Sequence, residues 1–225
     1  EHLLEQSKQV LAYEIDFELI PILNNNFKDK KLTLINDDFL KRNLDEDIKN
    51  LNTTYKKAIV VANLPYYITT PIIMKILEES SIVTELVVMM QYEVAKRFTG
   101  KPSTKDYNSL SVFIQYKTES KIALKVPKEV FIPAPNIDSA IVHMIIKEEL
   151  DNKPINEPFF FKLVRTSFTQ RRKTLVNNLF TGFGLTKPML INLLERLGYS
   201  ATVRAEKLTV DEFVALSNEL DREMS

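Results

Sequence analysis

The chain has 225 residues, with 30 basic and 30 acidic side chains, no cysteine and two histidines. The lack of cysteine excludes disulfides, thiolate zinc sites and a cysteine nucleophile, and two histidines disfavour a histidine-rich site, so we predict no metal centre. No apolar run approaches the roughly 18 residues of a membrane span, and no signal peptide opens the chain. We therefore expect no membrane association and a cytoplasmic location.

Glycine is scarce in this sequence. Only four residues are glycine, none of them before Gly100, whereas an average usage of about 7% would give roughly 16. Within these residues the shortage excludes a Walker loop and a G-x-G-x-x-G dinucleotide turn, because both need closely spaced glycines after a strand.

Strands and helices alternate through the first part of the chain. Short apolar runs rich in Val, Ile and Leu are typical of strands buried on both faces of a parallel sheet. In the helix between the last two strands, Thr70 is expected as the N-cap and Pro71 as the first helical residue. The four predicted strands are residues 10–16, 32–35, 58–62 and 86–90, and the apolar face of that helix is Ile72, Ile73, Ile76 and Leu77.

The middle of the chain is predicted to add a helix at residues 107–117. A closing strand pair is expected at residues 121–126 and 139–146. After these elements, a polar segment with a charge run and two prolines is typical of a linker.

Beyond the linker the hydrophobic pattern is purely helical. The phenylalanines that open residues 159–168 are interpreted as packing residues. Thr186 can cap a further helix, and Thr209 with Glu212 forms a capping box for the last one. The predicted architecture is an α/β domain over residues 1–147, a linker over residues 148–158 and a small all-helical domain over residues 159–225.

Basic residues are concentrated in one part of this neutral chain. Between Pro158 and Leu194 there are six basic residues and no acidic residue. A local basic patch favours contact with an anionic partner.

Polar side chains follow three successive predicted strands. The first strand ends near Glu14, the second is followed by Asp37 and Asp38, and the third by Asn63. In open α/β sheets, ligands bind at the carboxyl ends of the strands, and an acidic residue after the second strand accepts ribose hydroxyls. Taken singly, Glu14 and Asp38 are equally compatible with simple polar caps on strand ends.

The segment Asn63-Leu64-Pro65-Tyr66 is a more specific signal. Pro65 restricts its own backbone and that of Leu64, which holds the Asn63 side chain and nearby carbonyls rigidly beside an aromatic ring. Methylation of an adenine amine needs such a set, because two acceptors that hold its N–H bonds favour a pyramidal nitrogen with its lone pair free. The ring can stack on the extruded base, so positioning and electrostatics can carry the step.

Three motifs in this order resemble those of the ribosomal RNA adenine N6,N6-dimethyltransferase family, over nearly the whole chain. N-L-P-Y after a strand resembles the catalytic motif of adenine-N6 methyltransferases. Residues 130–139 resemble the F-x-P-x-P-x-V-D-S stretch of the family, with Ile137 in place of the usual Val. Residues 167–175 resemble the basic stretch of the bacterial small-subunit (KsgA/RsmA-like) branch. The resemblance implies a Rossmann-like class I S-adenosylmethionine methyltransferase sheet.

S-adenosylmethionine is the cofactor that the resemblance implies. Glu14 would bind its ribose, and Asp38 would accept from its adenine amine beside the backbone of Phe39, with Asp37 as a competitor for that contact. Asn63 would lie between the methionine end of the cofactor and the target amine.

The target base would lie between two aromatic rings. Tyr66 would stack on it as part of the catalytic motif with Leu64 and Pro65, and Phe131 would cover its other face, although Phe131 could instead be a core residue. The implied target is a pair of adjacent adenines in the 3′-terminal hairpin loop of 16S rRNA, in an immature small ribosomal subunit. The residues expected to contact RNA are Arg165, Arg171, Arg172 and Lys173.

Two other functions are compatible with parts of this pattern. A large-subunit rRNA adenine methylase of the macrolide-resistance type shares the catalytic motifs, but the Gln170–Lys173 stretch favours the small-subunit branch. A non-catalytic rRNA-binding assembly factor would share the basic stretch, but the intact N-L-P-Y favours an enzyme. We expect a monomer.

The family also has a first strand and a Gly-rich turn that contacts the cofactor, and neither occurs in these residues. Residues 1–6 are similar to the end of the helix that follows that turn. We therefore expect the chain to be an N-terminally truncated member, in which cofactor binding and activity are impaired.

Overall fold

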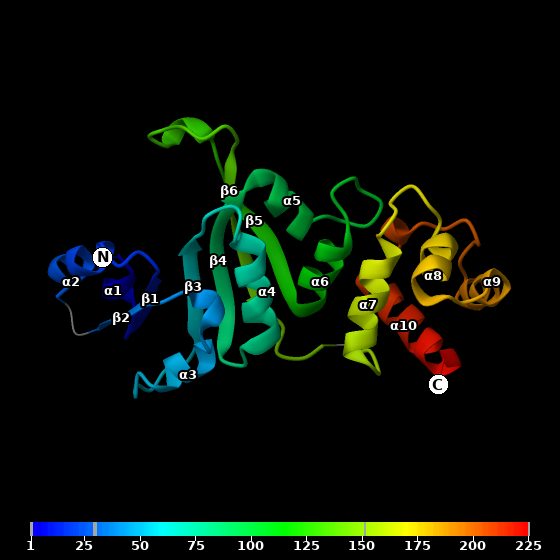
Figure 1. Ribbon diagram of the computed structural model, residues 1–225, viewed down its shortest axis with the longest axis horizontal. Coiled ribbons are helices and arrows are strands. Elements are labelled where there is room, and N and C mark those ends of the chain that lie inside the picture. Colours follow the sequence, from blue (N-terminus) through cyan, green and yellow to red (C-terminus); the bar gives the residue numbers. More distant parts are fainter. Residues whose placement is uncertain (1, 29–30, 151, 225) are drawn as a thin grey trace. The chain divides into compact units, whose positions relative to one another are not determined.

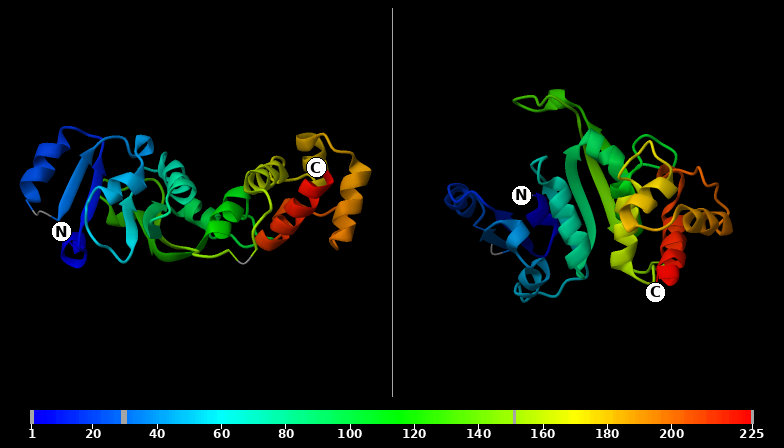
Figure 2. Two further views of the ribbon diagram at one scale, coloured as in Figure 1. Left: turned by 90° about the horizontal axis from the view of Figure 1, so that it is seen from below. Right: turned by 45° about the vertical axis from the view of Figure 1, so that its right-hand side comes forward.

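The computed structural model describes residues 2–28, 31–150 and 152–224. The chain forms two compact units, an N-terminal unit that ends at Val87 and a C-terminal unit that begins at Val88 (Figures 1 and 2). Among the residues described, no helix is both long and apolar enough to cross a bilayer.

The N-terminal unit contains a parallel strand pair. Strand β1 (Val10–Glu14) lies beside β2 (Leu32–Asn36), in a register that places Glu14 opposite Asn36. The other elements that begin in this unit are α1 (His2–Gln6), α2 (Leu19–Asn26), the 3-10 helix η1 (Phe39–Lys41), α3 (Leu44–Lys49), β3 (Ala58–Asn63), α4 (Thr69–Glu79) and β4 (Val83–Gln91), which crosses into the second unit. The four strands predicted for this part are therefore confirmed.

The C-terminal unit combines an antiparallel strand pair with helices. Its elements are α5 (Tyr92–Phe98), α6 (Ser109–Lys117), β5 (Thr118–Val126), the 3-10 helix η2 (Lys128–Val130), β6 (Ser139–Ile146), α7 (Glu157–Ser167), α8 (Leu175–Phe183), α9 (Lys187–Arg196), the 3-10 helix η3 (Ala205–Lys207) and α10 (Val210–Met224). Strands β5 and β6 pair from Thr118 opposite Ile146 to Val126 opposite Ser139, which confirms the predicted closing pair. The strand order of the larger sheet is β3-β4-β6-β5.

The start of α4 differs from the prediction, because the N-cap is Ile68 and not Thr70. The Ile68 N–H and the Thr69 hydroxyl both donate to the carbonyl of Pro65, at 3.1 and 3.0 Å. The turn after Pro65 therefore already has helical backbone at Ile68, and the helix begins at Thr69. The predicted apolar face is buried as expected.

The prediction that the strands are buried on both faces is wrong for β3. Its residues alternate between partly buried and exposed, and Ile59 and Val61 are 43% and 49% exposed. Side chains of a strand point alternately to its two faces. The run of apolar residues concealed this alternation, since every position carries an apolar side chain whichever face it occupies.

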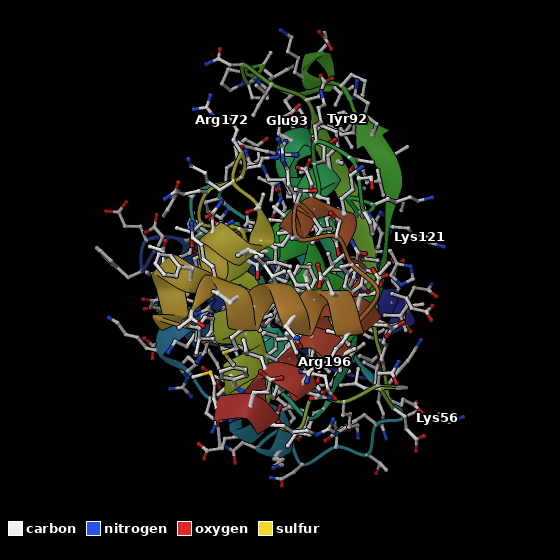
Figure 3. The ribbon with its side chains drawn as sticks, turned by 90° about the vertical axis from the view of Figure 1, so that its right-hand side faces the viewer. Lys56, Tyr92, Glu93, Lys121, Arg172 and Arg196 are labelled. Atoms are coloured by element: carbon white, nitrogen blue, oxygen red, sulfur yellow. The ribbon has the colours of Figure 1, made fainter. Side chains whose placement is uncertain are left out.

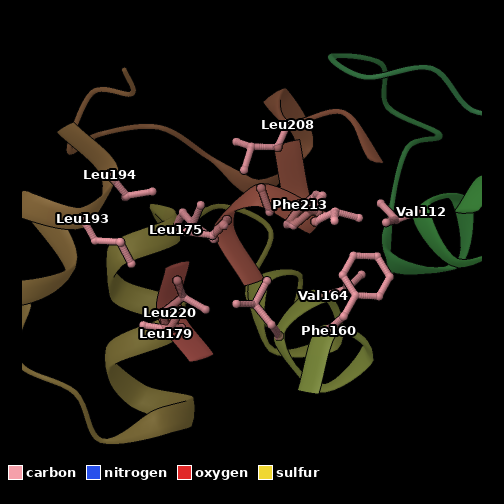
Figure 4. Packing of buried hydrophobic residues seen from close by; sticks show 14 of the residues in the cluster. Val112, Phe160, Val164, Leu175, Leu179, Leu193, Leu194, Leu208, Phe213 and Leu220 are labelled. Carbon is pink, nitrogen blue, oxygen red and sulfur yellow. The ribbon is translucent and has the colours of Figure 1, made fainter. Parts of the chain in front are cut away.

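Helix α6 begins later than predicted, at Ser109, because Asn108 and Ser111 form a capping box at its N-terminus. Tyr107 precedes the helix and is fully buried. Together with Val112 and Tyr116, it belongs to the same hydrophobic cluster as the apolar faces of α7, α8, α9 and α10 (Figure 4). Helix α6 therefore shares its core with the C-terminal helices.

The phenylalanines of α7 are packing residues, as predicted. Phe160 is fully buried with its ring centroid 4.9 Å from that of Tyr116. The ring of Phe161 lies 4.5 Å from Phe113, and the ring of Phe159 packs on α8. These contacts give α7 apolar neighbours on several sides.

The helix ends of this region follow local capping chemistry. The Thr209–Glu212 capping box is confirmed by two reciprocal hydrogen bonds. Thr186 occupies the N-cap of α9, but its side chain makes no capping bond. Helix α8 was not predicted, although both of its ends carry local signals. The Thr174 side chain accepts from the Asn177 N–H at the start of the helix, and Gly184, with a φ of 68°, lies at its end. Both residue types are usual at those positions.

Gly100 is required by close packing. A Cβ atom at this buried residue would lie 2.9 Å from the carbonyl carbon of Asp106 and 3.0 Å from the Tyr107 nitrogen. We expect Gly100→Ala to lower the free energy of unfolding by about 1–3 kcal/mol, the usual cost of overpacking. Chemical denaturation measures it, with Gly184→Asn as the control, because nothing lies within 4 Å there and Asn tolerates a positive φ. A Gly100→Ala protein as stable as the wild type would contradict this.

Candidate functional site

The end of β1 and the turn after β2 bring the predicted cofactor residues together. The Asn36 side chain donates to the backbone carbonyl of Glu14 at 2.8 Å, which joins the two strand ends. One Glu14 oxygen accepts from the Asp16 N–H at 2.9 Å, and Asp38 Oδ1 accepts from the Leu40 N–H at 3.0 Å, capping η1. Among the described residues, the second oxygen of each carboxylate has no hydrogen-bond partner.

Asp37 and Asp38 differ in their surroundings. Asp37 accepts from the Asp38 N–H at 2.8 Å, and its other oxygen lies 3.5 Å from the Arg42 guanidinium. Both Asp37 oxygens are therefore engaged by the protein. Only Asp38 keeps an oxygen without a partner among the described residues.

A polar network that the sequence did not indicate joins Tyr13, Arg42 and Asp47, close to the ends of β1 and β2. The Tyr13 hydroxyl donates to Asp47 Oδ2 at 2.9 Å, and Arg42 Nε donates to the same oxygen at 3.1 Å. The Tyr13 ring contacts the Phe39 ring edge to face, with centroids 5.1 Å apart. The hydrogen-bonded Arg42 guanidinium holds the pKa of Asp47 below its usual range, and burial raises the pKa of Tyr13. This network supports the segment that carries Asp38 and Phe39.

Asn63 ends β3 as an exposed residue whose side chain makes no hydrogen bond to another described residue. The Pro65 carbonyl is occupied by α4, whereas no described residue donates to the Leu64 carbonyl. Tyr66 is partly buried, and Tyr67 is 86% exposed. The motif therefore presents two acceptors, the Asn63 side-chain oxygen and the Leu64 carbonyl.

Phe131 belongs to the C-terminal unit, in the hairpin between β5 and β6, which Figure 1 draws in green. Asp138 anchors this hairpin at its base. Its side chain accepts from the Lys128 N–H at 3.1 Å and pairs with Lys125 Nζ at 2.8 Å, and its carbonyl accepts from the Tyr92 N–H at 3.0 Å. Since Phe131 lies in the other unit, its pairing with Tyr66 around a base stays a prediction.

The four basic residues expected to contact RNA have different environments. Arg165 lies in the last turn of α7, and Arg172 and Lys173 follow the helix; all three are exposed. In Figure 3 the side chain of Arg172 lies at the outer edge of the molecule. Arg171 instead directs its guanidinium at groups of the protein itself.

A family model described as ribosomal RNA adenine dimethylase matches residues 1–222 of this chain. The chain belongs to this family. It is therefore an enzyme that methylates adenine in ribosomal RNA, and membership implies S-adenosylmethionine as the methyl donor.

Curated relatives of this dimethylase agree with the assignment. The ribosomal RNA small subunit methyltransferase A of Streptococcus pneumoniae serotype 2 strain D39 is 46% identical over 224 residues, covering 98% of this chain and 77% of the relative. The protein of the same name from strain R6 matches equally.

Two solved structures share the fold. A dimethyladenosine transferase from Plasmodium falciparum superposes with a TM-score of 0.78, at 22% identity, over 99% of this chain and 86% of that one. The 23S rRNA methyltransferase ErmE superposes with a TM-score of 0.69, at 22% identity, over 96% of this chain and 83% of that one. The dimethylase chain therefore has a Rossmann-like methyltransferase fold with a helical C-terminal region.

The residues at the β1–β2 edge fit the chemistry of the implied cofactor. A ribose presents hydroxyl donors and an adenine presents an amine donor, and Glu14 and Asp38 each offer a carboxylate oxygen that the described residues leave unused. Among the described residues, the backbone N–H of Phe39, the first residue of η1, has no hydrogen-bond acceptor. An N–H of this kind complements the acceptor nitrogens of an adenine ring.

Loss of the Asp138 side chain is expected to slow this dimethylase by freeing the hairpin that carries Phe131. Phe131 is predicted to stack on the target base, and small misplacements of such a group are costly. We therefore expect Asp138→Ala to reduce kcat/KM about tenfold or more and to speed amide exchange in residues 127–137. Labelled methyl transfer and hydrogen exchange measure the two effects. Glu129→Ala, an exposed change in the same hairpin, is the control; equal behaviour of the two variants would refute the anchoring role.

Proposed function

We propose that this chain dimethylates N6 of two adjacent adenines in the 3′-terminal hairpin loop of 16S rRNA, in an immature small ribosomal subunit. The observation that carries the proposal is the 46% identity, across 98% of the chain, to relatives named ribosomal RNA small subunit methyltransferase A. The basic stretch at Gln170–Lys173 favours the same branch over a large-subunit methylase. The enzyme would act in the cytoplasm as a monomer.

The cofactor would be held at the β1–β2 edge. S-adenosylmethionine supplies an electrophilic methyl group when bound. Glu14 would accept from its ribose hydroxyls, and Asp38 would accept from its adenine amine while the Phe39 N–H donates to the ring. Asn63 would lie at the methionine end of the cofactor. The unused carboxylate oxygens of Glu14 and Asp38 support this arrangement.

The target amine would be oriented by two acceptors. The Asn63 side-chain oxygen and the Leu64 carbonyl would accept its two N–H bonds and leave the nitrogen lone pair directed at the methyl group. Pro65 would keep this pair of acceptors rigid, since its own carbonyl is bound by the first turn of α4. Tyr66 would stack on one face of the extruded base and Phe131 on the other, and such stacking is worth about 1–3 kcal/mol per base.

Exposed basic side chains would bind the RNA backbone. Arg165, Arg172 and Lys173 are exposed and lie between Pro158 and Leu194, the stretch without acidic residues. Each phosphate contact contributes affinity that falls as salt rises. These residues would therefore orient the hairpin without reading its sequence.

The deciding experiment compares two substrates. The purified protein is incubated with labelled S-adenosylmethionine and either small or large ribosomal subunits from cells that lack the corresponding methylation, and the modified bases are mapped. We expect dimethyladenosine at two adjacent positions near the 3′ end of 16S rRNA only. Transfer to large subunits instead, or mapped labels elsewhere in 16S rRNA, would overturn the proposal.

A further inference from the structure

Three segments that are distant in the sequence meet in the C-terminal unit. They are the loop of residues 101–105, which lies between α5 and α6, the segment of residues 171–173 between α7 and α8, and η3 (Figure 1). The Ser103 N–H donates to the backbone carbonyl of Glu206 at 2.6 Å, which joins the loop to η3. The side chain of Arg171 joins all three.

Three of the five N–H donors of the Arg171 guanidinium are engaged by these contacts. Its Nε donates to Glu206 Oε2 at 3.0 Å, one terminal nitrogen donates to the Lys105 carbonyl at 2.5 Å, and the other donates to the Thr104 carbonyl at 3.2 Å. Two of the three acceptors are main-chain carbonyls of the 101–105 loop. A planar fork of five N–H donors can bridge such a set, whereas the compact ammonium of lysine cannot reach three separated acceptors at once.

The loop that Arg171 holds is itself basic. Lys101 and Lys105 are both exposed, and no acidic residue lies within residues 101–105. The neighbouring Arg172 and Lys173 are exposed as well, while the acid that η3 contributes, Glu206, is paired with Arg171. Neither residues 101–105 nor residues 171–173 contain an aromatic side chain. Exposed cations without a stacking ring suit phosphates and not bases.

We propose that Arg171 is a positioning residue that clamps the 101–105 loop, so that Lys101 and Lys105 contact RNA backbone phosphates beside Arg172 and Lys173. This rests on the proposed function, in that the anionic partner is ribosomal RNA. The assignment changes the expected role of Arg171, which the basic motif alone would count among the phosphate contacts. It also adds two RNA contacts from a segment outside residues 158–194.

Hydrogen exchange of the free protein tests the clamp without any RNA. In Arg171→Lys we expect amide exchange in residues 101–106 to become at least tenfold faster, because the carbonyl contacts are lost while the charge is kept. The matched control is Arg172→Lys, which should exchange as the wild type does. Unchanged exchange of the loop in Arg171→Lys would overturn the clamp.

RNA affinity tests the consequence. The probe is a labelled RNA hairpin with the 3′-terminal small-subunit sequence, bound at several salt concentrations. Replacing Lys101 and Lys105 together by alanine should weaken RNA binding by the otherwise wild-type protein about tenfold or more. It should also make the slope of log affinity against log salt shallower by roughly 1.4–1.8, because each phosphate contact contributes about 0.7–0.9. The same double substitution should have little further effect in Arg171→Lys. Full additivity of the two changes would contradict the proposal.

A second variant guards against a general loss of folding in Arg171→Lys. Glu206→Ala removes one acceptor of the clamp and leaves the arginine in place. The clamp predicts faster amide exchange in residues 101–106 of Glu206→Ala, because one of the contacts that fix Arg171 is lost, and exchange as in the wild type would overturn it. A wild-type protein that binds no ribosomal RNA would refute the proposed function, and the exchange experiment would still decide whether the clamp exists.

Discussion

Replacing Asn63 by alanine is expected to lower kcat for adenine methylation by about 100- to 1,000-fold, the usual effect of removing one preorganised acceptor or donor at a reacting centre. The change removes the side-chain oxygen proposed to accept from the target amine. Labelled methyl transfer to undermethylated small subunits, under single-turnover conditions, measures the loss in the chemical step.

Stability should hardly change in this variant, because Asn63 is exposed and its side chain bonds to no described residue. Asn192→Ala is the matched control, since Asn192 is an exposed asparagine on α9. We expect it to keep both activity and melting temperature. Asn63→Ala activity within threefold of the wild type would remove Asn63 from the catalytic role.

Replacing Asp47 by alanine is expected to destabilise the N-terminal unit by about 2–3 kcal/mol. Asp47 is 5% exposed and accepts hydrogen bonds from Tyr13 and Arg42. Removing one partner of a fully buried ion pair costs about 3–5 kcal/mol, and the effect is smaller here because the Arg42 side chain is 35% exposed. Chemical denaturation measures the change, with hydrogen exchange to assign it to the N-terminal unit.

Asp37→Ala is the control for this prediction, because Asp37 pairs with the same Arg42 at 3.5 Å but is 41% exposed. Exposed pairs contribute about 0–1 kcal/mol. We expect Asp37→Ala to lie within that range. Similar decreases in the free energy of unfolding for Asp47→Ala and Asp37→Ala would show that burial of the network adds no stability beyond that of an exposed ion pair.

The same network has a defined dependence on pH. The hydrogen bond from Arg42 is the largest cause of the lowered pKa of Asp47, so the folded state binds this proton less readily than the unfolded state. The stability it contributes is fully present above the unfolded pKa of about 4 and is lost as the pH falls through the folded value. Below about pH 4, the wild type should therefore lose stability more steeply than Asp47→Ala in a pH series of denaturation curves. Parallel slopes would contradict the linkage.

The sequence by itself determined the features that depend on neighbouring residues. The parallel strands and their acidic ends follow from short apolar runs that stop at Glu14 and before Asp38. N-L-P-Y has a rigid backbone because Pro65 restricts it. The Thr209–Glu212 box needs only two residues three positions apart. Such signals are local, so they can be interpreted without a fold.

Tertiary structure alone decided which side chains meet. Tyr13 and Asp47 are 34 residues apart, and Arg171 lies 66 residues from Lys105, whose carbonyl it binds. Nothing in the local sequence marks these pairs, because a tyrosine on a strand or an arginine in a basic run satisfies its local pattern whatever its partner. Burial and the need to pair charged groups set these contacts only once the chain has folded. For that reason the basic motif predicted four RNA contacts without showing that one of these residues, Arg171, also binds groups of the protein itself.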